Sequence, residues 1–147
     1  MVNEVRGLRE EAGISQAELA ARSGVAQPNI AAYESGRRRA SAEMLQRLRL
    51  AARPLPSQAL AAKRRQLEEL ARESGLTNVR VFGSVARGSD GPGSDLDLLV
   101  TRGDGVGLLT ITRFAEAASE LLGVSVDVVT DGCLAEAHEI IRTAVAV

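Results

Sequence analysis

The chain has 147 residues, of which 45% are hydrophobic and 25% are charged, and its formal net charge is −1. This composition excludes a disordered chain, and the length allows one ordinary domain or two small ones. The apolar runs are too short to span a bilayer and no signal-peptide pattern is present, so we expect a cytoplasmic protein with no membrane partner. A single cysteine, Cys133, and a single histidine, His138, exclude an internal disulfide and a His/Cys zinc site.

Charge is unevenly distributed along the chain. Residues 1–53 carry nine arginines against six glutamates, whereas residues 78–147 carry five arginines against ten acidic residues. This asymmetry predicts two modules with different partners.

The first module is predicted to be all helical. A first helix ends at Gly13, and a second begins at Ser15, where Glu18 completes a capping box, and ends at Gly24. A third spans about 25–35 and a fourth about 41–52. Two prolines in "RPLP" (53–56) then interrupt helix propagation. We therefore place one domain at 1–53 and a second at 54–147, with the first helix of the second at about 57–74.

The second module mixes strands and helices. Alternating apolar residues predict strands at 78–84, 95–101 and 124–130, and helical spacing predicts helices at 108–123 and 134–145. This order predicts a layer of helices against one sheet, so the whole chain is expected to be a two-domain α+β protein.

Residues 14–36 have the spacing of a helix-turn-helix, although an ordinary helical bundle fragment has similar features. The segment "SQAELAARSGVAQPNIAAYESGRR" resembles the XRE/Cro-type repressor helix-turn-helix, over about residues 3–52. The resemblance implies that Gln16 contacts phosphate and that Gln27 and Asn29 face base edges in the major groove. Arg37, Arg38 and Arg39 would bind phosphates, the alternative being a solvated helix end. Specific binding to operator DNA then implies a homodimer on two half-sites.

Two aspartates in the strand "DLDLLVT" raise a different question. Asp95 and Asp97 are two residues apart, so both side chains are expected on one face. Adjacent carboxylates repel each other unless a cation lies between them, and oxygen ligands suit Mg²⁺ or Mn²⁺. Asp127 is a third carboxylate in an apolar strand, and three carboxylates with two divalent ions form a general scheme for phosphoryl transfer. Taken singly, each aspartate is also compatible with a solvated strand face or edge.

Anion ligands for a triphosphate are available in "FGSVARG". Gly83 permits close backbone approach, Ser84 offers an N–H and a hydroxyl at a helix start, and Arg87 adds a positive charge. A Gly-Ser pair alone is most often an ordinary turn.

Together, Gly83-Ser84 and Asp95-Leu96-Asp97 resemble the signature of the DNA polymerase β-like nucleotidyltransferase superfamily. "RVFGSVARGSDGPGSDLDLLV" is similar to its minimal nucleotidyltransferase branch, the antitoxin partners of HEPN-domain toxins, and the resemblance covers about residues 57–147. It implies a small α/β nucleotidyltransferase-type domain with a mixed sheet. It also implies that Asp95, Asp97 and Asp127 bind two Mg²⁺ ions, that Asp127 activates the acceptor hydroxyl, and that Gly83 and Ser84 hold the nucleotide phosphates.

The leading interpretation is an antitoxin that transfers AMP from ATP to a hydroxyl of a HEPN-type toxin, encoded by the adjacent gene, and represses its own operon. One alternative is a transcriptional regulator whose second domain only binds nucleotide or a partner. A less favoured alternative is a nucleotidyltransferase for small molecules such as antibiotics, because few residues remain for an added substrate domain.

Overall fold

The computed structural model describes residues 3–133 and 138–147. The chain divides into two compact units, Met1–Pro54 and Leu55–Val147, and each unit has its own hydrophobic core. In the described part of the chain, no helix combines the length and apolar character that a membrane crossing needs.

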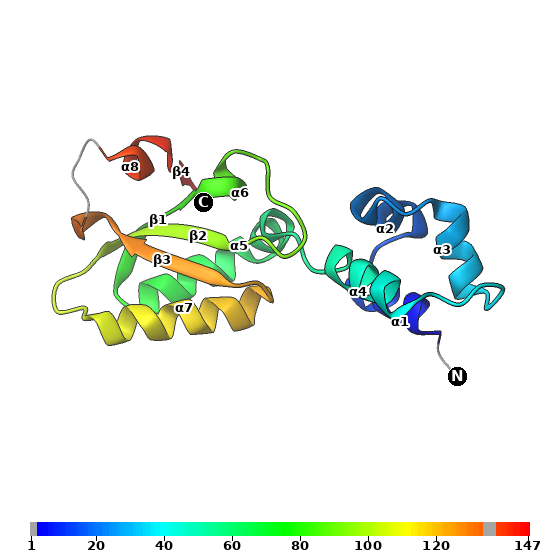
Figure 1. The fold of residues 1–147 in the computed structure, drawn as a ribbon. Helices are drawn as coiled ribbons and strands as arrows, with labels where there is room; N and C mark the ends of the chain where they lie inside the picture. The colour runs from blue at the N-terminus through cyan, green and yellow to red at the C-terminus, as the bar shows by residue number, and fades with distance from the viewer. Residues whose placement is uncertain (1–2, 134–137) are drawn as a thin grey trace. The chain divides into compact units, whose positions relative to one another are not determined.

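The first unit consists of the helices α1 (Glu4–Ala12), α2 (Gln16–Ser23), α3 (Gln27–Glu34) and α4 (Ala42–Ala51), coloured blue to cyan in Figure 1. Ser15 caps α2 by accepting a hydrogen bond from the Glu18 N–H at 3.0 Å, and Gly24 ends α2 in the left-handed conformation at φ +71°. The helices bury one apolar cluster: Val5, Leu19, Val25, Ile30, Tyr33, Leu48 and Ala51.

A buried carboxylate joins three helices of this unit. Glu34, at the end of α3, is only 5% exposed. It accepts hydrogen bonds from Arg9 Nε of α1, at 2.7 Å, and from the Gln16 side-chain amide of α2. Arg9 also donates to the Ile14 carbonyl at 3.0 Å. Because the charge of Glu34 is both paired and hydrogen-bonded, its burial is compatible with a stable core.

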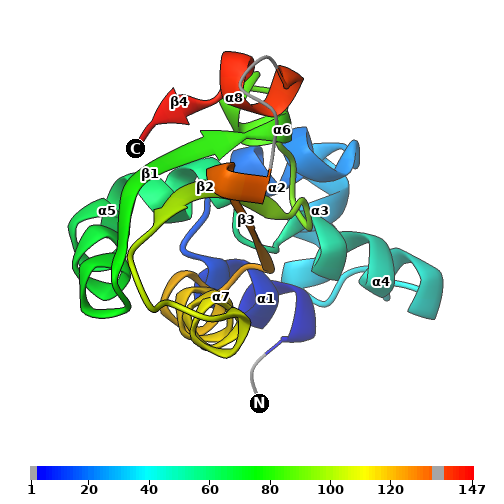
Figure 2. The same ribbon diagram turned by 90° about the vertical axis from the view of Figure 1, so that its left-hand side faces the viewer.

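The second unit is built on a mixed sheet. It begins with α5 (Pro56–Glu73) and continues with β1 (Leu76–Phe82), α6 (Gly83–Ala86), β2 (Leu96–Arg102), α7 (Leu108–Leu122) and β3 (Val126–Thr130). A short 3₁₀ turn (Asp131–Cys133), α8 (Glu139–Thr143) and β4 (Val145–Ala146) complete it. The strand order is β3-β2-β1-β4, with β2 and β3 parallel and the other neighbours antiparallel. Figures 1 and 2 both show α5 and α7 on one side of the sheet and α8 on the other.

Strand alternation gives the two faces of the sheet different residues. Leu96, Leu98 and Val100 of β2 are fully buried and pack into the cluster that contains Leu67 of α5 and Phe114 of α7. Since successive side chains of a strand point to opposite faces, the residues between them, beginning with Asp97, lie on the face away from α5 and α7.

A β-bulge interrupts β1 near its start. Thr77 pairs with Thr101, but the next pair is Arg80 with Leu99, so β1 has one residue more than β2 in this interval. Asn78 lies there at φ +51°, in the left-handed region that asparagine tolerates better than most residues. The bulge allows Leu76 and Val81, five residues apart, to enter the same core.

The end of the chain corrects one prediction. The sequence pattern predicts a helix at 134–145, of which 134–137 lie outside the described residues. From His138 on, the helical part is limited to α8, Ala144 is extended, and Val145 pairs with Val81 as the start of β4. The physical reason is that the outer edge of β1 offers unpaired backbone groups and that β-branched Val145 suits a strand.

Candidate functional site

Two of the predicted carboxylates lie side by side on the face of the sheet away from α5 and α7. Asp97 of β2 is in register with Asp127 of β3, because these two strands run parallel and pair residue by residue from Leu96 with Val126. Asp95 immediately precedes β2 and is exposed. Asp97 is partly buried, whereas Asp127 is exposed.

The electrostatics of Asp97 reflect these neighbours. Its pKa is raised from the ordinary 3.8, first by burial and then by the negative charges of Asp127 and Asp95. The positive charge of Arg87 acts in the opposite direction and lowers the pKa. Asp95, Asp127 and Arg87 therefore all lie within electrostatic range of Asp97.

Gly83 forms a close contact with the same carboxylate. It follows β1 at φ +70°, and a Cβ at this position would lie 2.3 Å from Asp97 Oδ2. A side chain is thus excluded both by the backbone conformation and by the carboxylate. Ser84 is the next residue in the first turn of α6, and Arg87 is the C-cap residue of that helix. The Gly-Ser turn and the aspartates therefore meet at one end of β1 and β2.

The donor set fits hard divalent cations, because its members are carboxylates and a cation would relieve the repulsion that, after burial, raises the pKa of Asp97. Among residues 3–133 and 138–147, however, no three His, Cys, Asp or Glu side chains form a group already arranged to hold a metal ion. Asp97 and Asp127 are aligned by the ladder, while Asp95 approaches from outside it.

A second polar cluster lies further along the same strands, and sequence patterns did not indicate it. Asp131, just after β3, accepts hydrogen bonds from the Thr101 hydroxyl at 2.6 Å and from Arg80 Nη2 at 2.8 Å. These bonds, that of Thr101 first, hold the pKa of Asp131 below its ordinary value. This cluster fixes the segment after β3 to β1 and β2.

In the first unit, α2 and α3 flank the turn at Gly24 as the helix-turn-helix prediction requires. Gln27, at the start of α3, is exposed. Asn29 is partly buried, and its Oδ1 accepts a hydrogen bond from Arg38 Nη1 at 3.3 Å. The side-chain amide of Gln16, at the start of α2, donates to Glu34.

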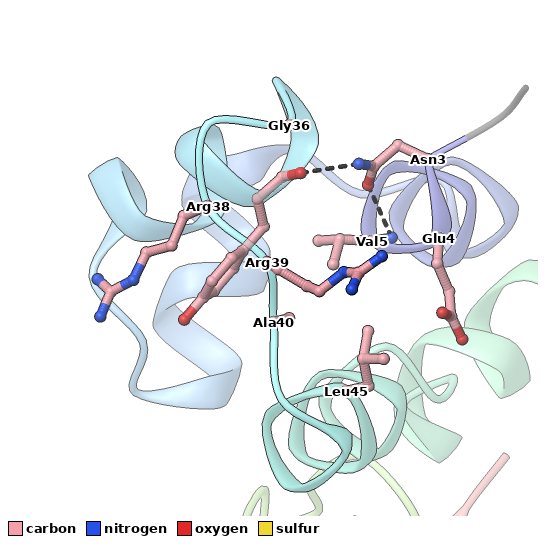
Figure 3. A pocket seen from close by; sticks show the side chains of 9 residues that line it. Asn3, Glu4, Val5, Gly36, Arg38, Arg39, Ala40 and Leu45 are labelled. Atoms are coloured by element: carbon pink, nitrogen blue, oxygen red, sulfur yellow. Dashed lines mark hydrogen bonds between the residues drawn. The ribbon is translucent and has the colours of Figure 1, made fainter.

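The arginine run after α3 is exposed but does not point in one direction. Figure 3 shows Arg38 directed away from α1 and Arg39 directed towards it, across a pocket of about 280 Å³. Asn3 borders this pocket and donates from its side chain to the Tyr33 carbonyl at 2.7 Å. Arg37 is exposed. Arg38 and Arg39 therefore present their charges in two different directions.

Comparison with known proteins agrees with this division. Residues 5–51 match the helix-turn-helix family and residues 63–144 match the nucleotidyltransferase domain family. A Methanocaldococcus jannaschii protein that bears the name of a protein adenylyltransferase is 36% identical over 67 residues, which are 46% of this chain and 72% of that protein.

Solved structures give matches as well. A structure described as a minimal nucleotidyltransferase is 41% identical, with a TM-score of 0.57, over 62% of this chain and 95% of that one. A toxin–antitoxin structure with AMP-PNP matches at 23% identity and a TM-score of 0.44, over 48% of this chain and 59% of that one, which is too distant to support an inference. With a family match over more than half its length, and a helix-turn-helix ahead of that match, the chain belongs to the nucleotidyltransferase domain family.

Proposed function

We propose that this protein is a DNA-binding antitoxin that transfers AMP from ATP to a hydroxyl group of a partner toxin of the HEPN type and represses its own operon as a homodimer. The family match supports nucleotidyl transfer, and the name of the M. jannaschii relative favours a protein as the acceptor. The helix-turn-helix match supports the DNA-binding part. The HEPN partner and autorepression come from the resemblance of the motif to minimal nucleotidyltransferase antitoxins.

One observation carries the proposal. Gly83 packs against the carboxylate of Asp97, and Asp97 is paired in register with Asp127. A phosphate-binding turn next to paired carboxylates is the arrangement that transfer from a metal-bound triphosphate needs, because the same cation can then contact protein and phosphate oxygens.

The roles proposed for the residues are those that the resemblance to minimal nucleotidyltransferases implies. Asp95, Asp97 and Asp127 would hold Mg²⁺, or Mn²⁺ in its place, and the bound cation would neutralise charge on the phosphates. Gly83, Ser84 and Arg87 would bind the triphosphate. Asp127 would accept the proton of the acceptor hydroxyl while that oxygen bonds to the α-phosphorus. The bond from the α-phosphorus to the bridging oxygen breaks, and pyrophosphate leaves.

The test is incubation of the full chain with α-labelled ATP, Mg²⁺ and the product of the adjacent gene. We expect label on that protein and release of pyrophosphate, both abolished by D95A and D97A. Transfer that persists in these variants would contradict the assigned site. Autorepression is tested separately, with a promoter reporter and the R37A/R38A/R39A variant, which should lose repression and keep transfer.

A second function is favoured by the position of Asp95, which is exposed and precedes β2 instead of lying in the ladder with Asp97 and Asp127. In this alternative the second unit binds nucleotide or a partner and performs no transfer. The D97A variant distinguishes the two, because a regulator without catalysis would neutralise its partner equally well with Asp97 replaced.

A further inference from the structure

The loop that joins the Gly-Ser turn to the aspartates is held by a contact outside the motif. Asp90 lies in this loop, between α6 and β2, and its Oδ2 accepts a hydrogen bond from the Ser57 backbone N–H at 2.9 Å. Ser57 is the second residue of α5, which the loop approaches in Figure 1. Asp90 is partly buried.

The start of α5 lacks a cap of its own. Leu55, the N-cap residue, makes no side-chain capping hydrogen bond, and Pro56 has no N–H to satisfy. The first N–H groups of a helix have no intrahelical partner, and a carboxylate there is favoured both by hydrogen bonding and by the helix dipole. Asp90, which is thirty-three residues from Ser57 in the chain, supplies the capping hydrogen-bond acceptor that the Leu55 side chain lacks.

The loop has few internal means of holding its shape. The Ser89 N–H donates to the Ser84 carbonyl at 2.9 Å, and Gly91 and Ser94 bond to each other across a tight turn. Both contacts are local, so they do not fix the loop against another element. Asp90 does, because it ties the loop to a helix that packs into the core through Leu60 and Leu67.

We propose that Asp90 is a positioning residue for the nucleotidyl-transfer site. By capping α5, it sets the separation between Gly83-Ser84 on one side of the loop and Asp95-Asp97 on the other. This inference rests on the proposed function, since the two groups are taken to hold phosphates and cation. Displacement of reacting groups by about 1 Å can cost up to about a hundredfold in rate, so a single anchor of this kind has kinetic consequences.

The experiment compares D90A, D90N and S57A in the full chain. D90N keeps an acceptor oxygen and S57A keeps the backbone N–H, so both are matched controls for D90A. Two quantities are measured: amide exchange at Ser57, and affinity for a non-hydrolysable ATP analogue with Mg²⁺. For D90A we expect exchange faster by about fivefold, the typical loss of a cap. We also expect affinity to fall by about tenfold, with both controls near wild type. KM for ATP should rise in parallel.

The outcomes separate this inference from the proposed function. Affinity and KM equal to those of the wild type in D90A would overturn the positioning role, because a loss of folded protein by itself lowers only the apparent kcat. Unchanged Ser57 exchange in D90A would overturn the cap itself. If the wild-type chain binds the analogue but labels no acceptor, the proposed transfer fails, and weaker analogue binding by D90A would still support the role of Asp90.

Discussion

Each unit of this protein contains a carboxylate that is at least partly buried, and the surroundings of the two carboxylates have opposite electrostatic effects. Glu34 in the first unit is 5% exposed and has a cationic partner in Arg9 and an amide donor in Gln16. Asp97 in the second is partly buried, and this burial, together with the negative charges of Asp127 and Asp95, raises its pKa, while Arg87 is the opposing charge. A paired buried acid holds helices together, whereas a crowded one stores unfavourable charge that a ligand can relieve.

Removing Glu34 should have the largest effect. E34A leaves Arg9 without its charged partner, and breaking a buried ion pair in this way costs about 3–5 kcal/mol. We expect the first unit to unfold at much lower denaturant concentration and DNA binding to be lost. The second unit has its own core, so nucleotide transfer should remain.

The matched control is E18A. Glu18 also pairs with an arginine, Arg22, at 2.9 Å, but its side chain is 45% exposed, and such surface pairs contribute about 0.5 kcal/mol or less. Equal destabilisation by E18A and E34A, measured by chemical unfolding, would contradict the structural role assigned to Glu34.

D97N should affect activity and stability in opposite directions. Activity is expected to fall at least about a hundredfold, since substitutions even beyond the inner ligands of metal sites cost tenfold to a hundredfold. Because the folded-state pKa of Asp97 lies above 3.8, its charge destabilises the fold above that folded pKa, and the penalty disappears as pH falls below 3.8. D97N therefore raises the melting temperature of the metal-free protein at neutral pH.

The same pair of proteins tests the cation. Mg²⁺ should raise the melting temperature of the wild type and have a smaller effect on D97N. If D97N melts at a lower temperature than the wild type in the presence of a chelator, the proximity of the carboxylates does not destabilise the metal-free fold.

G83A should have an intermediate effect. Alanine at φ +70° costs about 1–2 kcal/mol, and its Cβ would also displace the Asp97 carboxylate. Gly88 provides the control, because it has φ +69° and nothing lies within 4 Å of the position that a Cβ would take there. Both variants should lose similar stability, while G83A loses on the order of tenfold more activity. Equal activity in the two variants would argue against a functional contact between Gly83 and Asp97.

Asp131 should give the smallest effect, visible only as a pH dependence. Its folded-state pKa is lowered, so its stabilising contribution is present above the unfolded pKa and is lost as pH falls through the folded pKa. The melting temperatures of wild type and D131N, recorded from pH 7 to pH 3, should therefore differ most at neutral pH and converge in acid. A constant difference would contradict the shift.

Much of this could be predicted from local patterns. Helix α2 is an example: its N-cap Ser15, its C-cap Gly24 and its apolar periodicity all lie within a few residues of the helix. Predicting such a helix therefore needs no tertiary information. The Gly83-Ser84 pair and the alternating Asp95 and Asp97 are also recognisable from sequence, because their spacing is a local pattern.

The remaining features depend on partners distant in sequence. Glu34 and Gln16 are eighteen residues apart, Arg80 and Asp131 fifty-one, and β4 forms because a strand edge is available at β1. One sequence feature indicates that a contact such as that of Asp90 is needed. Helix α5 starts at Pro56, and its N-cap residue Leu55 has no polar side chain that could cap it. An apolar N-cap residue shows that the helix needs a cap from elsewhere, but it does not show which residue provides that cap.

The bulge at Asn78 has a consequence for how this domain tolerates change in chain length. Leu76, before the bulge, and Val81, after it, both face the core. In a regular strand, residues five apart would face opposite sides, so the segment between them contains one extra residue. Deleting Asn78 would restore regular pairing and leave both leucine and valine facing inward. The strand thus contains one extra residue at the end away from Gly83, where a deletion can be accommodated without shifting the end of β1 that leads into Gly83.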